Sequence, residues 1–78
     1  MTWEDCQNFG YVEVDHQSNG IRVYSDRIYS RFITCPGFGR IESAIWSGRH
    51  VICKVRNSHG VLETYLQKSF HEYLLVFS

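Results

Sequence analysis

Histidine and cysteine are the residue types in this chain that most often form structural zinc sites. They are His16, His50, His59, His71, Cys6, Cys35 and Cys53. The cysteines form no C-x-x-C pair, and the spacing between His59 and His71 would place them on different sides of a single helix. We therefore expect neither a metal site nor a cofactor.

Nucleophilic catalysis and phosphate binding often leave sequence signatures, and this chain lacks them. There is no G-x-S-x-G element around any serine. Gly37 and Gly39 match the first two glycines of a dinucleotide-binding loop, but Glu42 stands at the third position, where a carboxylate would repel phosphate. A 78-residue domain also has little room for a substrate pocket beside its core. The sequence thus predicts a protein that is not an enzyme and has no catalytic residues.

Basic and acidic residues are equal in number, 8 of each, but unevenly placed. Residues 1–19 hold four acidic and no basic side chains, whereas residues 20–60 hold seven basic and two acidic ones. A basic surface with aromatic rings is typical of domains that bind RNA or single strands. The pI of about 6.9 lies below the value of roughly 9 usual for such domains. Nucleic-acid binding through residues 20–60 is therefore the alternative function, not the first choice.

Aromatic residues make up 15% of the chain, more than one small core can cover. Tyr, Trp and Arg left on a surface are the residues that dominate protein interfaces. The surplus favours a protein partner or a homodimer. The candidate partner-binding residues are Tyr24, Arg40, Trp46, Arg49, His50, Lys54 and Arg56.

The first half of the chain contains a predicted helical turn and a hairpin. In residues 2–10, Thr2 can cap a short helix and Gly10 can end it. Residues 11–24 alternate apolar and polar side chains around Asn19-Gly20, a strong hairpin signal because both residues tolerate positive φ. Residues 26–34 fit a helix or a strand.

A second hairpin is expected at residues 40–56, with its turn at Ser47-Gly48. In its second arm the alternation predicts one face with Val51, Cys53 and Val55 and an opposite face with His50, Ile52, Lys54 and Arg56. Cys53 falls on the inner face, where a small buried thiol would sit. Residues 61–77 carry apolar side chains at helical spacing, which predicts an amphipathic helix. The alternative is a strand at 61–67, a turn at 68–72 and a last strand at 73–77.

Three widely spaced cysteines make a poor disulfide framework, which favours a reducing compartment, the cytoplasm. No stretch is apolar enough to span a membrane, so no membrane partner is expected.

The predicted fold is a single α+β domain over residues 1–78. It has an antiparallel sheet of about four strands in two hairpins, with the C-terminal helix packed on one face. The alternative is a small SH3-like or OB-like β-barrel. The predicted function is non-catalytic protein binding by a small inhibitor or adaptor that covers a partner's surface; size alone suggests the accessory proteins of mobile elements.

Overall fold

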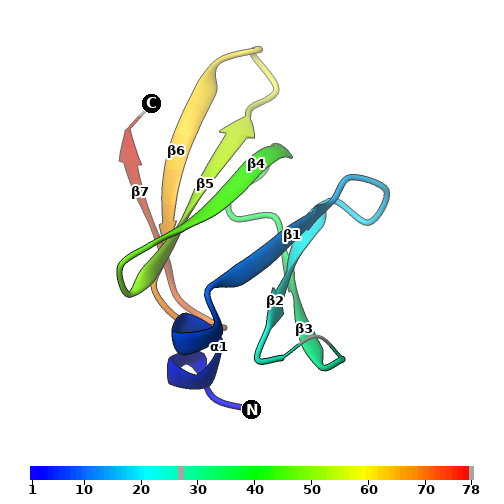
Figure 1. Cartoon of the computed structure of the whole chain (residues 1–78). Helices are drawn as coiled ribbons and strands as arrows, with labels where there is room; N and C mark the ends of the chain where they lie inside the picture. The colour runs from blue at the N-terminus through cyan, green and yellow to red at the C-terminus, as the bar shows by residue number, and fades with distance from the viewer. Residues whose placement is uncertain (27, 78) are drawn as a thin grey trace.

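Seven strands and one short helix form the part of the chain that the structure describes. The computed structural model describes residues 1–26 and 28–77 (Figure 1). The elements are α1 (Trp3–Phe9), β1 (Tyr11–Asp15), β2 (Gly20–Tyr24), β3 (Ser30–Thr34), β4 (Arg40–Ser47), β5 (His50–Arg56), β6 (Leu62–Gln67) and β7 (Tyr73–Phe77). They form two antiparallel sheets, with strand orders β1-β2-β3 and β4-β5-β6-β7.

Helix α1 confirms the helical turn predicted near the N-terminus. The Thr2 hydroxyl accepts a hydrogen bond from the Asp5 backbone N–H at 3.1 Å, and the Asp5 carboxylate accepts one from the Thr2 N–H at 3.2 Å. This reciprocal capping satisfies two donors that the first turn would otherwise leave free. Gly10 ends the helix, and its N–H donates to the Cys6 carbonyl. The helix thereby turns Cys6 into the core.

The three-stranded sheet contains the first predicted hairpin. Strands β1 and β2 pair from Tyr11 opposite Tyr24 to Asp15 opposite Gly20. In the connecting turn Asn19 has a φ of 53°, whereas Gly20 does not take a positive φ. The segment 26–34, predicted as helix or strand, supplies β3, which pairs with β2; position 27 lies outside the described residues.

The four-stranded sheet contains the second predicted hairpin as β4 and β5, followed by β6 and β7. The predicted C-terminal helix is therefore wrong. The alternative considered for that segment matches the structure, because β6 and β7 occupy its two strand positions. The predicted α+β class with about four strands is also wrong: the structure is mostly strand, with a single helix of seven residues among those described. The barrel alternative does not describe these two separate sheets either.

The core lies between the two sheets, with Cys6 of α1 contributing at one side. It consists of Cys6, Ile21, Val23, Ile33, Ile41, Val51, Cys53, Val55 and Tyr65. Strand β5 supplies three of these side chains at alternate positions, because successive residues of a strand point to opposite faces. Strand β1 lies beside β4 (Figure 1), which brings the edges of the two sheets together.

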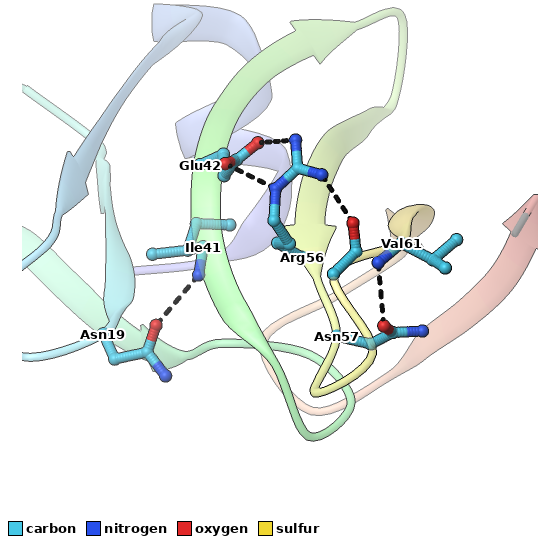
Figure 2. A network of polar contacts seen from close by, with 7 residues as sticks. Asn19, Ile41, Glu42, Arg56, Asn57 and Val61 are labelled. Carbon is cyan, nitrogen blue, oxygen red and sulfur yellow. Dashed lines mark hydrogen bonds and ion pairs between the residues drawn. The ribbon is translucent and has the colours of Figure 1, made fainter.

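Asn19 joins the two sheets through its side-chain amide. Its Oδ1 accepts a hydrogen bond from the Ile41 backbone N–H at 2.9 Å (Figure 2), and its Nδ2 donates to the Gly39 carbonyl at 3.0 Å. The two bonds imitate the pairing of a neighbouring strand and satisfy backbone groups at the start of β4.

The three cysteines are free thiols, and Cys53 is fully buried as the sequence predicted. Burial raises the pKa of the Cys53 thiol to about 12. In residues 1–26 and 28–77, no helix is long and apolar enough to cross a membrane.

Candidate interaction surface

The four-stranded sheet has an outer face that points away from the core. Its direction is fixed by β5, whose Val51, Cys53 and Val55 point inward, so that the alternate residues of β5 point outward. Cross-strand pairing then assigns the outward residues of the other three strands.

A row of four aliphatic side chains crosses this outer face, one from each strand. Ile45 pairs with Ile52, Ile52 with Leu66, and Leu66 with Leu74. We call these four residues the aliphatic row. Ile45 is 65% exposed and Leu74 is 51% exposed, while the two central residues are half-buried by their neighbours. A continuous apolar strip on a surface is a common mark of an interaction site.

Strand β7 extends this apolar surface to the edge of the sheet. It is paired with β6 on one side, and its other side forms the sheet's edge (Figure 1). Tyr73, Leu74, Leu75 and Val76 are all between 45% and 51% exposed, so both faces of the strand remain accessible. The strand contains neither a charged residue nor a proline, the devices that usually prevent edges from pairing with other chains.

Three of the predicted site residues lie on β5 and flank the aliphatic row. His50, Lys54 and Arg56 all lie on the outward face of β5. The Lys54 ammonium donates a 2.7 Å hydrogen bond to the Thr64 hydroxyl on the neighbouring strand. The structure therefore brings these three predicted residues to one face, beside a row that the sequence analysis did not identify as a unit.

Arg56 is neutralised within the chain. Its guanidinium donates to both carboxylate oxygens of Glu42, at 3.0 and 3.1 Å (Figure 2). It also donates to the Gly60 carbonyl at 2.7 Å. A register shift between Ile41 and Ser43 places Glu42 on a bulge beside Arg56. The hydrogen bonds from Arg56 hold the pKa of the Glu42 carboxyl below its usual value.

The remaining predicted residues lie elsewhere. Arg40, the first residue of β4, is exposed and pairs in register with Arg56. Arg49 is exposed in the turn between β4 and β5. Trp46 is on the inner face, with its ring centroid 5.0 Å from that of Trp3 and its indole nitrogen buried. Tyr24 belongs to the three-stranded sheet.

Two further arginines of residues 20–60 also contact side chains of the same chain. Arg22 forms a 3.1 Å ion pair with Asp15, and Arg31 lies 4.4 Å from the centroid of the Phe70 ring. These contacts reduce the number of basic groups that the segment can offer to a partner.

Among the described residues, 1–26 and 28–77, no group of three or more His, Cys, Asp or Glu side chains is placed to hold a metal ion. Comparisons with protein-family models, curated proteins and solved structures found no match for the chain.

Proposed function

We propose that this protein is a non-catalytic protein-binding module, a small inhibitor or adaptor that acts by covering or bridging a partner's surface. The aliphatic row on the outer face of the four-stranded sheet carries the proposal. Covering an exposed aliphatic side chain completely contributes about 1.5–3 kcal/mol, so finishing the burial of half-exposed Ile45 and Leu74 provides a favourable contribution to binding.

The edge of β7 favours a partner that adds an extended strand. Such a strand would satisfy the backbone groups along the outer side of β7 and lay apolar side chains next to Leu74 and the rest of the aliphatic row. A second copy of the chain is one partner of this kind, because two β7 strands can pair antiparallel about a two-fold axis. The homodimer thus remains part of this proposal.

The basic side chains of residues 20–60 give less support to nucleic-acid binding than the aliphatic row gives to protein binding. Arg22 and Arg56 form ion pairs within the chain, and Lys54 is hydrogen-bonded to Thr64.

Three free thiols fit a reducing compartment, and we propose a cytoplasmic location on that ground.

Single charges introduced into the aliphatic row test the proposal. Ile45→Glu and Leu74→Glu each place a carboxylate in the contact, and Thr34→Glu, at an exposed position of the three-stranded sheet, is the matched control. Light scattering over a range of concentrations measures self-association, and quantitative capture from the native cell's extract measures other partners.

The wild-type and Thr34→Glu proteins should form the same complex, and both row variants should weaken it at least tenfold. Circular dichroism verifies that all variants are folded. A complex that all variants form equally well would contradict the proposal, as would a wild-type protein that remains a 9.2 kDa monomer and captures nothing.

A further inference from the structure

A second surface feature lies at the end of the first hairpin, on the three-stranded sheet. It is a shallow depression lined by Phe9, Gly10, Tyr11, Glu13 and Tyr24. Three of these five residues are aromatic and one is a carboxylate, a combination that differs from the purely aliphatic row on the other sheet.

The local fold explains how these side chains meet. Gly10 ends α1 and leads directly into β1, which places Phe9 beside Tyr11. Tyr11 pairs in register with Tyr24 on β2. Glu13, two residues beyond Tyr11, lies on the same face of β1 because side-chain direction repeats every second residue.

The rings meet at different angles. The Phe9 and Tyr11 centroids are 6.0 Å apart with the planes at 85°, and the Tyr11 and Tyr24 centroids are 4.8 Å apart with the planes at 53°. Phe9 is 39% exposed and Tyr11 is 46% exposed, so these two rings remain accessible. The electron-rich faces of such rings attract cations, and their carbon surface accepts an aliphatic stem.

The carboxylate of Glu13 adds negative charge at the same place. Its Oε2 accepts hydrogen bonds from the hydroxyls of Tyr24, at 3.1 Å, and Tyr11, at 3.4 Å. The hydrogen bond to Glu13 raises the pKa of Tyr24, so the phenol stays protonated as a donor.

The basic residue opposite Glu13 is engaged with another partner. Arg22 faces Glu13 across the strands but pairs with Asp15 and lies 5.3 Å from the centroid of the Phe32 ring. The two ion pairs found among residues 1–26 and 28–77 are Arg22–Asp15 and Arg56–Glu42, and neither uses Glu13.

We propose that this depression binds an organic cation, and that its occupant is the side chain of a lysine on a protein partner. The aliphatic stem lies over the Phe9 and Tyr11 rings, and the ammonium group reaches Glu13. The inference rests on the proposed function in one respect, that the partner is a protein, but it concerns a different sheet.

Lysine fits better than arginine because of the acceptors that Glu13 offers. Both tyrosine hydroxyls donate to Oε2, so neither of these hydrogen bonds occupies Oε1. A guanidinium group binds carboxylates best through two parallel hydrogen bonds, whereas an ammonium group acts as a point charge that one oxygen can satisfy.

Small probes test the site without knowledge of the partner. The full chain is titrated with Nα-acetyl-lysine methylamide, with the arginine analogue, and with Nα-acetyl-norleucine methylamide, which keeps the aliphatic stem but lacks the charge. Two-dimensional NMR follows the backbone amides of Gly10, Tyr11 and Tyr24. We expect saturable shifts with the lysine probe, binding at least threefold weaker with the arginine probe, and none with the norleucine probe.

Two charge-matched variants locate the contact. Glu13→Gln keeps the shape of the depression and should weaken lysine binding at least fivefold, while Glu4→Gln removes an equal charge from α1 and should leave it unchanged. Equal binding of the lysine and norleucine probes, or unchanged lysine binding by Glu13→Gln, would overturn the proposal. Tighter binding of the arginine probe, or of tetramethylammonium in place of lysine, would overturn the assigned occupant.

The same titration separates this proposal from the previous one. Ile45→Glu alters the other sheet and should leave the lysine titration unchanged. Loss of partner capture with an intact lysine titration, or the reverse, therefore identifies which of the two proposals has failed.

Discussion

Asn19 holds the backbone of Ile41 by a 2.9 Å hydrogen bond from the Ile41 N–H to the Asn19 side-chain oxygen, and so ties the turn of one sheet to the first strand of the other. Asparagine suits this position for two reasons. It tolerates the left-handed backbone with φ of 53°, and its amide offers both an acceptor for Ile41 and a donor for Gly39.

Substitution of Asn19 should separate these two roles. Asn19→Gly keeps the left-handed backbone but removes both hydrogen bonds, and should lower the free energy of unfolding by about 1–3 kcal/mol. Asn19→Ala adds the strain of a left-handed residue with a Cβ, a further loss of roughly 1–2 kcal/mol. Urea denaturation measures both. A glycine variant as stable as the wild type would show that the bridge contributes nothing.

Gly37 should be far less tolerant of alanine than Gly48. Both have positive φ, 73° and 61°, so both alanine variants share the backbone strain. A Cβ on Gly37 would overlap the hydroxyl and ring of Tyr65, whereas one on Gly48 would meet nothing within 4 Å. Because Tyr65 is a buried core residue, its displacement should cost Gly37→Ala an additional 1–3 kcal/mol or so.

The midpoint of thermal unfolding, compared between Gly37→Ala and Gly48→Ala, checks this prediction. Gly48→Ala serves as the control for the backbone strain alone. Equal midpoints would mean that the Tyr65 ring moves aside without cost.

Cys53 should make stability depend on alkaline pH. Desolvation by burial raises the pKa of its thiol from 9.0 to about 12 in the folded state. The unfolded chain therefore loses the proton first, and the free energy of unfolding should fall as the pH rises from 9.0 towards 12. Cys53→Ala lacks this titration, so its stability should decline less steeply over the same range, measured by urea denaturation at each pH.

Thiol labelling gives an independent measurement on the same residue. At pH 8 the native protein should react at the partly exposed Cys35 before Cys53, which should react only when the chain unfolds. Labelling of Cys53 at the rate of Cys35 in the folded protein would contradict its burial.

The elements that are defined by local signals could be predicted from the sequence. Thr2 and Gly10 mark the ends of α1, and the alternation around Asn19-Gly20 marks the first hairpin. In β5 the inward and outward residues were also assigned correctly, because His50 to Arg56 alternate cleanly between apolar inner positions and mostly polar outer ones.

The C-terminal strands could not be predicted in this way, because β6 and β7 break the alternation. Leu66 and Leu74 are apolar although they face outward, while Gln67 is buried although it is polar. The Gln67 amide donates to the Ser69 and Glu72 carbonyls in the following turn, a local arrangement that no periodicity reveals. The resulting spacing of apolar residues imitates a helix.

Only part of the geometry of the candidate interaction surface could be predicted from the sequence, because the rest depends on how the strands pair. His50, Lys54 and Arg56 were correctly placed on one face, but the aliphatic row depends on the registers of four strands, which are set by pairing across the sheet. The pairing of Arg56 with Glu42 likewise depends on the bulge in β4. Residues chosen for their chemical type alone therefore included Trp46, whose ring packs inside.

The position of β7 leaves its backbone supported on one side only within the four-stranded sheet. Strand β5 is hydrogen-bonded on both sides and carries fully buried side chains, whereas β7 is held by β6 alone. A guest strand seated against β7 would convert it from an edge strand into an interior strand, so that docking itself would make local opening of this strand rarer.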